Sequence, residues 1–277
     1  MITRHLVVLA PNFAYTYPVE MLNHIQSHCR PAQGIEHHAT STLTPEVTES
    51  RILSMLGRRK PMALIGISLR PTATAVARYQ EAETPIVLID ETTDGTSTVA
   101  VDNYQGGLIA GQHLVKMGRR NIAIVCGETG TATSFNAVAR LKGLRAALSA
   151  AGLPLPATHV VEVHYYSYPE GRQALKTWHD QKLKIDAVFC AAGDDCATGL
   201  LRAAQELGIG VPSDLAVIGF DDIEAAQSTL PPLTTVRQPL DKIAKAAYEL
   251  ASDGDNDIAQ HPRKVVFDPQ LIVRQSA

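Results

Sequence analysis

The sequence has few cysteines and no closely spaced pair of them. The four cysteines stand at positions 29, 126, 190 and 196, with no Cys-x-x-Cys spacing. Disulfide frameworks and structural zinc sites normally show such pairs, so we expect neither. Cys126 and Cys190 lie in apolar stretches that predict buried strands, where a free thiol packs as a small apolar side chain. We therefore expect reduced cysteines in a cytoplasmic protein.

Long apolar runs and a large excess of charge are also missing. No run reaches the length of a membrane span, so no membrane partner is expected. The formal net charge of -3 argues against a chain that grips nucleic acid by itself. The first ten residues have too short an apolar core for a signal peptide and no cleavage-like site. They are predicted to hold the first strand of the fold.

No motif of a known catalytic or cofactor site is complete. The sequence contains no Walker loop, and Gly127–Gly130 lacks the rest of a dinucleotide fingerprint. Gly66–Ser68 lacks the second glycine of a nucleophile elbow. His24 and His28 have the i, i+4 spacing of a metal pair, but no third ligand is evident and a solvated helix face is favoured. The prediction is a protein that is not an enzyme and holds no cofactor or metal.

What the chain does contain is a regular alternation of apolar runs and helix-spaced apolar residues. Short connections join them, which is typical of a parallel sheet with right-handed crossovers. Strands are predicted at 6–10, 34–39, 62–67, 85–89, 121–126, 159–163, 186–190, 215–219, 264–267 and 271–273, and 98–101 can cross to a second lobe. The polar, turn-rich stretch at 91–98 is predicted to end a first lobe. Asp102 and Asn103 then supply the N-cap of the next helix.

The stretch Ser213–Pro239 is the most informative one. Leu215–Gly219 is a short apolar run that predicts a buried strand, and Asp221 and Asp222 follow just past its end. Open α/β sheets bind ligands at that edge. Two prolines then force an extended path that ends at Gln238. A strand, an acidic loop and a polar side chain at the end of a crossing together predict a cleft between two lobes.

Several spaced motifs resemble one known family. They are VDNYQGGLIAGQHL at 101–114, GRRNIAI at 118–124, RLKGLRAAL at 140–148, VPSDLAVIGFDD at 211–222, PPLTT at 231–235 and QP at 238–239. Together they resemble the effector-binding domain of LacI/GalR-type transcriptional regulators. The resemblance covers nearly the whole chain and is strongest from about residue 99 to 250.

The resemblance implies a fold and a function. The expected fold is α/β: two Rossmann-like lobes with parallel sheets, joined by three hinge crossings, as in type I periplasmic-binding-protein-like domains. The crossings are expected near Val101, Gln238 and Asp268. The N-terminal lobe is then 1–101 plus 239–267, and the C-terminal lobe is 102–238 plus 268–277.

The expected function is that of a sensor which binds a small polar effector, sugar-like or purine-like, in the inter-lobe cleft and switches lobe closure in a homodimer. The family's helix-turn-helix module is missing from this sequence, so operator DNA is expected as a partner only through such a module. The alternative is a solute (sugar) binding protein of a transport system. The absent signal peptide and the motif at 211–235 weigh against it.

Three residues are the leading candidates for effector contacts. Arg140 is expected to open the first turn of a helix that faces the cleft, where its guanidinium offers paired donors. The resemblance makes it an effector contact and makes Asp221 an acceptor for ligand hydroxyls. Asp222 is then expected to cap the following helix. Gln238 is either a polar contact or a hinge-stabilising hydrogen bond.

Two further positions refine the expected site. Gly193 and Asp194 stand where the family usually shows Asn-Asp, and the lost amide puts a typical hexose or pentose effector in doubt. Asp194 is expected to be a helix N-cap. Tyr166 is expected to be an aromatic platform for the effector, with Tyr165 and Tyr168 as alternatives.

Loops at predicted strand ends supply the remaining candidates, because these ends face a cleft in the expected fold. They are Asn12, Phe13, Ser68, Arg70, Asp90, Ser134 and Phe135.

Overall fold

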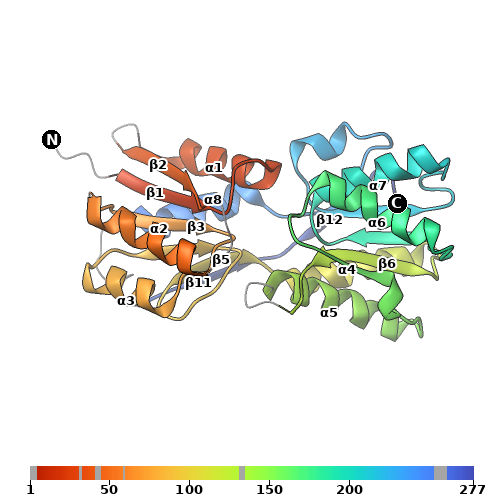
Figure 1. Ribbon diagram of the computed structural model, residues 1–277, viewed down its shortest axis with the longest axis horizontal. Helices are drawn as coiled ribbons and strands as arrows, with labels where there is room; N and C mark the ends of the chain where they lie inside the picture. The colour runs from red at the N-terminus through yellow and green to blue at the C-terminus, as the bar shows by residue number, and fades with distance from the viewer. Residues whose placement is uncertain (1–4, 31–32, 41–44, 59, 131–134, 253–260) are drawn as a thin grey trace. The chain divides into compact units, whose positions relative to one another are not determined.

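The computed structural model describes residues 5–30, 33–40, 45–58, 60–130, 135–252 and 261–277. The chain divides into two compact units. The first is Met1–Val101 with Pro239–Phe267, and the second is Asp102–Gln238 with Asp268–Ala277. Each unit holds one six-stranded sheet and belongs to the α/β class (Figure 1), so the predicted fold class is confirmed. No helix in the described ranges is both long and apolar enough to cross a membrane.

The sheet of the first unit is parallel throughout. Its strands are β1 (His5–Ala10), β2 (Gly34–Ala39), β3 (Ala63–Ile67), β4 (Ile86–Ile89), β5 (Ser97–Val101) and β11 (Lys264–Phe267). They are ordered β11-β5-β4-β3-β1-β2. The strand order reverses direction between β1 and β3, which is where open α/β sheets form ligand crevices.

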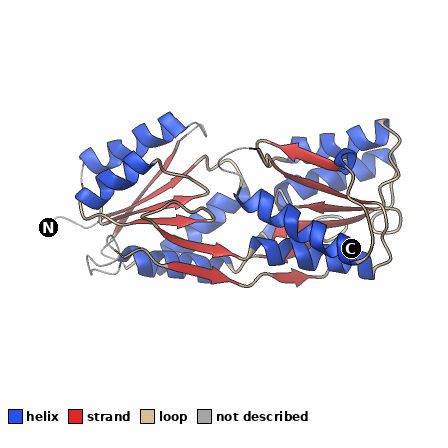
Figure 2. Ribbon diagram, turned by 90° about the horizontal axis from the view of Figure 1, so that it is seen from below, coloured by secondary structure: helices blue, strands red, loops and turns tan. Residues whose placement is uncertain are grey.

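Two helices cover each face of this sheet. Side chains alternate along β1, so Leu6 and Val8 pack in one core and Val7 and Leu9 in another. The first core lies under α1 (Thr16–His28) and α8 (Leu240–Ser252). The second lies under α2 (Pro45–Arg58) and α3 (Ala73–Glu81). Figure 2 shows the helices outside the strands.

The second unit repeats this plan with one exception. Its strands are β6 (Ile122–Gly127), β7 (Val160–Val163), β8 (Ala187–Cys190), β9 (Ala216–Asp221), β10 (Thr234–Arg237) and β12 (Gln270–Ile272), in the order β12-β10-β9-β8-β6-β7. The last strand, β12, pairs antiparallel with β10, whereas the sequence predicted parallel sheets. The switch point here lies between β6 and β8.

Two closely packed helix pairs cover this second sheet. The pair α6 (Tyr168–Asp180) and α7 (Asp194–Leu207) buries Trp178 against one face. The pair α4 (Asn103–Lys116) and α5 (Phe135–Ala150) contacts strands β6, β8, β10 and β12. Two short 3₁₀ helices, η1 (Ala157–His159) and η2 (Glu224–Gln227), lie in connections. A Cβ added to Gly107 would lie 2.0 Å from the Arg140 carbonyl oxygen, so α4 and α5 approach closely because this residue has no side chain.

Candidate functional site

Asp221 and Gln238 meet at the carboxyl edge of the second unit's sheet. Asp221 ends β9, and Gln238 follows β10, the neighbouring strand. The Gln238 Nε2 donates to Asp221 Oδ1 at 2.7 Å, and the backbone N–H of Gln238 donates to the Asp221 carbonyl at 3.2 Å. Both residues are buried: 3% of the surface of Gln238 is exposed, and 9% of that of Asp221. The Gln238 Oε1 has no hydrogen-bond partner among the described residues.

Asp222 does not cap the following helix as predicted. Its carboxylate accepts from Arg237 Nε and from Arg274 Nη2, each at 2.6 Å. The segment that follows is the 3₁₀ helix η2, whose N-cap is Ile223 without a side-chain bond. Asp222 therefore anchors the acidic loop to β10 and to the segment after β12. The predicted cap was wrong because the second arginine comes from a distant part of the chain.

Asp194 is not a helix N-cap either. It is the first residue of α7, and Gly193 holds the N-cap position with φ 103°. The Asp194 carboxylate is 1% exposed; its Oδ1 accepts from Thr235 Oγ1 at 2.6 Å, and its Oδ2 accepts from the Ile223 N–H at 3.1 Å. Burial, and next the charge of Asp221, hold the pKa of Asp194 well above its usual range. Asp194 thus joins the start of α7 to the loop after Asp221 and to β10.

Arg140 lies at the same edge of the sheet, and its hydrogen bonds are to other groups of the second unit. It is the sixth residue of α5, not part of its first turn as predicted, and 6% of its surface is exposed. Its Nε donates to Asn103 Oδ1 and its Nη1 to the Ala191 carbonyl, both at 2.7 Å. The guanidinium carbon stands 3.5 Å from the centre of the Phe220 ring. Burial and these contacts exclude a role as a solvated surface arginine.

Asn103 is a site residue that the sequence analysis treated only as part of a helix cap. Asp102 does cap α4, accepting from the Gln105 N–H at 2.9 Å, as predicted. Asn103 instead accepts from Arg140 and donates from Nδ2 to Asn136 Oδ1 at 2.9 Å. The adjacent polar residues Asp102 and Asn103, of which only one is needed as a cap, were the sequence feature that could have identified it.

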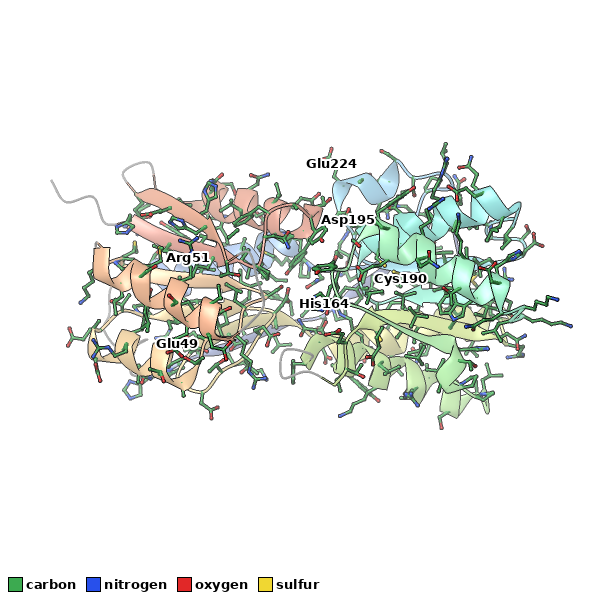
Figure 3. All side chains as sticks on the ribbon, in the orientation of Figure 1. Glu49, Arg51, His164, Cys190, Asp195 and Glu224 are labelled. Carbon is green, nitrogen blue, oxygen red and sulfur yellow. The ribbon has the colours of Figure 1, made fainter. Side chains whose placement is uncertain are left out.

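Tyr166 lies over the end of β6. A Cβ on Gly127, the last residue of that strand, would stand 1.8 Å from the Tyr166 hydroxyl, so the ring occupies that space. Tyr166 has φ 59° and is 39% exposed. Its neighbour Tyr165 packs edge-on against His164, which lies 3.4 Å from Glu128. Figure 3 labels His164 at the end of β7. Tyr166 is thus the tyrosine at the strand ends, and its contact with an effector stays a prediction.

The first-unit candidates lie at the carboxyl ends of β1, β3 and β4. Asn12 Oδ1 accepts from the Ala14 N–H at 3.0 Å, and Phe13 packs edge-on against His37 at 5.5 Å. Ser68 follows β3 with φ 50°, and Asp90 follows β4 with φ 65°. The Tyr17 hydroxyl donates to Asp90. Ser134, also predicted, lies outside the described residues, while Phe135 is exposed at the start of α5.

Glu91 was not predicted as a site residue, because the polar stretch around it reads as a solvated turn. Only 5% of its surface is exposed, and its Oε2 has no partner among the described residues. Burial raises the pKa of Glu91 to about 7; the charge of Arg70 opposes this shift and that of Asp90 adds to it.

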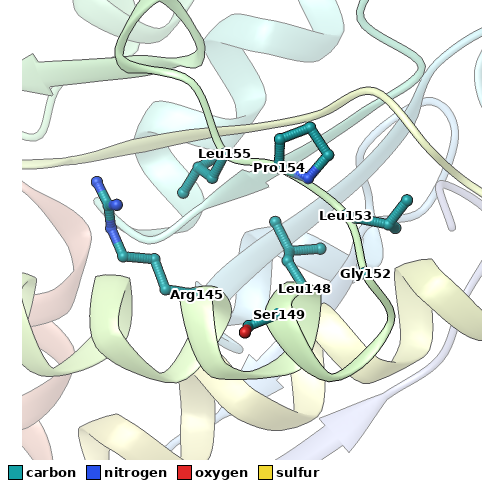
Figure 4. A pocket seen from close by; sticks show the side chains of 7 residues that line it. All are labelled: Arg145, Leu148, Ser149, Gly152, Leu153, Pro154 and Leu155. Atoms are coloured by element: carbon teal, nitrogen blue, oxygen red, sulfur yellow. The ribbon is translucent and has the colours of Figure 1, made fainter.

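Cavities elsewhere contain none of these residues. One of about 490 Å³ lies on the last turns of α5 and the segment after it (Figure 4). Its lining residues are Arg145, Leu148, Ser149, Gly152, Leu153, Pro154 and Leu155. Another, of about 660 Å³, lies against α2 and Thr72. Neither coincides with a switch point. Among the described residues, no group of three His, Cys, Asp or Glu side chains is arranged to hold a metal ion.

Comparison with known proteins gives a consistent result. The family description "Periplasmic binding protein-like domain" matches residues 112–277, more than half of the chain. The regulator DegA of Bacillus subtilis (strain 168) is 28% identical over 279 residues, covering 99% of this chain and 81% of DegA. The repressor PurR of Klebsiella pneumoniae (strain 342) is 27% identical over 278 residues, covering 99% of this chain and 80% of PurR.

A solved structure extends the likeness to three dimensions. The structure titled "transcriptional regulator CelR-cellobiose complex" is 26% identical and superposes with a TM-score of 0.86. It covers 99% of this chain and 85% of the CelR chain. With the two α/β units and the matched domain, these likenesses agree with the motifs at 101–148 and 211–239. The chain belongs to the periplasmic binding protein-like domains, and within them it is the effector-binding domain of a LacI/GalR-family transcriptional regulator.

Proposed function

We propose that this chain senses a small polar metabolite, sugar-like or purine-like, at the carboxyl edge of the second unit's sheet, and that it catalyses no reaction on it. The observation that carries the proposal is the buried Gln238 Oε1, which has no donor among the described residues. A buried acceptor left without a partner costs about 1–3 kcal/mol. A ligand N–H or O–H at that atom would remove this penalty.

The orientation of the Gln238 amide supports this proposal. With Nε2 facing Asp221 Oδ1 at 2.7 Å, the amide donates to a carboxylate. The flipped amide would place two acceptors against each other, so the hydrogen bond decides the assignment. The unpartnered atom is therefore an acceptor, and the proposed effector brings a donor to it.

Arg140 supports the same site in a different way from the one predicted. Two of its nitrogens hold the guanidinium against Asn103 and the Ala191 carbonyl. Its Nη2 makes no such bond within the described residues, which leaves that group for a ligand acceptor. The internal bonds pre-organise the donor, and pre-organisation lowers the entropy lost on binding.

The relatives support a regulatory role over the alternative of a transport protein. DegA and PurR are both named as transcriptional regulators, and CelR is described in a complex with cellobiose. We infer that this chain likewise acts in the cytoplasm and reaches operator DNA through a separate DNA-binding module. A cleft shared by both lobes, closure on binding and a homodimer stay predictions. Solution scattering with and without effector tests the closure, and sizing chromatography tests the dimer.

Thermal melting with a metabolite panel tests the binding proposal. The panel holds neutral sugars, sugar phosphates, purines and small acids. A ligand that binds only the folded protein raises the midpoint, by an amount that corresponds to about 2.7 kcal/mol at a hundredfold excess over Kd. We expect Gln238→Met to remove the shift of any hit, and Asp221→Asn to weaken it.

Matched variants keep the result interpretable. Gln173→Met, on the exposed face of α6, makes the same replacement away from the site and should leave the shift unchanged. Arg140→Lys keeps the charge but loses the paired geometry, so it should weaken binding without the unfolding risk of Arg140→Ala. A hit that survives Gln238→Met, Asp221→Asn and Arg140→Lys alike would move the site elsewhere.

A further inference from the structure

The loop between β4 and β5 buries two polar atoms that find no hydrogen-bond partner among the described residues. Glu91 is 5% exposed, and its Oε2 has no hydrogen-bond partner in the described part of the chain. Thr93, two residues later, has a buried hydroxyl that also lacks a partner there. Native proteins satisfy nearly all buried polar groups, so each exception calls for a ligand, an ion or a water.

The charges around Glu91 favour one kind of ligand. Asp90 precedes it and accepts from the Tyr17 hydroxyl of α1. Arg70, from the loop after β3, is the one cation among the described residues whose charge acts on Glu91. From α3, Gln80 donates to the Gly95 carbonyl of the same loop and brings no charge. Two carboxyl groups thus face one guanidinium, and an ionised Glu91 leaves a local excess of one negative charge.

We propose that Glu91 and Thr93 form a binding site in the first unit that takes a positively charged, hydrogen-bond-donating group, namely an amine. This inference goes beyond the proposed function, because it places a ligand site in the first unit and names the chemical class of its ligand. An ammonium group carries three donors and no acceptor, so it can serve both unpartnered oxygens. An anionic group would meet Asp90 and Glu91 with like charge.

The location of this loop agrees with such a role. Glu91 is the second residue after β4, next to Asp90, at the edge of the first sheet that also carries Ser68. Parallel sheets bind ligands at this edge. Burial raises the pKa of Glu91 to about 7, so a bound ammonium group would convert a partly protonated carboxyl into a carboxylate and release its proton. Affinity for an amine should therefore rise with pH up to about 7 and then level off.

A matched set of ligands tests the inference with the purified chain. The set is D-glucose, its analogue with an amine in place of the primary hydroxyl, and its phosphate ester at the same carbon. Putrescine and butanediol form a second pair that differs in the same way. Calorimetric titration at pH 6 and at pH 8 measures each Kd. We expect the amine of at least one set to bind about tenfold or more tightly than its neutral partner, as charge-assisted hydrogen bonds do.

Substitutions test whether Glu91 and Thr93 cause the preference for amines. Glu91→Gln should remove most of the amine preference and its pH dependence, while Glu81→Gln, an exposed carboxylate on α3, should change neither. Thr93→Val should weaken amine binding and leave the pH dependence in place. An amine preference that Glu91→Gln leaves intact would overturn the inference.

The remaining outcomes separate this inference from the proposed function. Equal binding of neutral and amine ligands, or a preference for the phosphate ester, would keep the sensor and remove the amine subsite, leaving water as the partner of Glu91. If no member of either set bound, and the wider panel also gave no shift, both the proposed function and this inference would fail.

Discussion

At the scale of the residue, one buried carboxyl group, that of Asp194, fixes the geometry of the candidate site. It accepts from Thr235 Oγ1 and from the Ile223 N–H, and these groups flank Gln238 and Asp221 in the chain. Burial, and next the charge of Asp221, raise the pKa of Asp194, so the folded protein favours the protonated form. The stability that this proton gives is present below the ordinary value of 3.8 and is lost as the pH rises through the raised pKa.

Two substitutions separate the hydrogen bonds of Asp194 from its charge. Asp194→Asn keeps an acceptor for Ile223 and offers an amide to the Thr235 hydroxyl, which can turn to accept. We expect this variant to match or exceed the wild-type stability at neutral pH in urea denaturation. Asp194→Ala leaves two buried donors unsatisfied and should lower the free energy of unfolding by about 2–4 kcal/mol. A variant Asp194→Asn as unstable as Asp194→Ala would show that the charge itself is required.

The sequence predicted which side chains lie together at the sheet edge better than it predicted the contacts that each one makes. The motif resemblance singled out Asp221 and Gln238, and the structure brings the two into direct contact. The role of Asp222 was wrong because its partner Arg274 lies 52 positions away and only the fold unites them. Glu91 was missed because a glutamate in a turn-rich stretch normally faces water.

At the scale of the element, glycines set how closely helices pack and therefore where Arg140 stands. A Cβ at Gly107 of α4 would lie 2.0 Å from the Arg140 carbonyl oxygen. A Cβ at Gly143 of α5 would lie 2.0 Å from the Tyr104 carbonyl oxygen. Neither helix can rotate or approach differently without a shift of backbone.

Gly107→Ala should therefore push α5 away from α4 and displace Arg140. We expect a loss of about 1–3 kcal/mol in the free energy of unfolding, as in other overpacked cores, together with weaker effector binding. Gly57→Ala in α2 is the matched control: nothing lies within 4 Å of its added Cβ, and better helix propensity should stabilise the protein by up to about 1 kcal/mol. Chemical denaturation of both variants measures the difference. Equal effects at the two positions would contradict the close-packing argument.

The strands and helices themselves were predictable because local patterns determine them. The strands predicted at 34–39 and 264–267 have the bounds that the structure shows. Helix ends were predicted less well: α5 begins at Phe135, five residues before the arginine that was expected to open it. Nothing in the local pattern distinguishes an exposed first turn from the loop before it. The antiparallel pairing of β12 depends on its partner strand, which sequence periodicity does not reveal.

At the scale of the whole molecule, groups with shifted pKa values act on stability in opposite directions. Glu206 contacts Arg172, Lys176 and Arg202, and these bonds lower its pKa to about 2. Its contribution is present above the ordinary value of 4.5 and is lost as the pH falls through 2. It is modest because the cluster is exposed to solvent. Glu91 has the opposite effect on stability. Its raised pKa means that the folded state holds a proton which the unfolded chain has released, so its contribution is lost as the pH rises.

The domain should therefore be most stable in mildly acidic solution. As the pH rises above 4.5, the folded protein loses the protons of Glu91 and Asp194, and we expect the melting midpoint to fall by about 5 °C. Burial lowers the pKa of His113, which opposes this trend near its ordinary value of 6.5, so the decrease should be smaller than the two carboxyl groups alone would give. Melting curves from pH 4 to pH 8 measure the profile. Glu91→Gln should reduce the decrease on the neutral side and leave the acidic side unchanged, whereas Glu206→Gln should do the reverse. A wild-type midpoint that climbs steadily towards pH 8 would show that Glu91 is ionised in the folded protein at every pH in this range, and its buried carboxylate would then already have a partner.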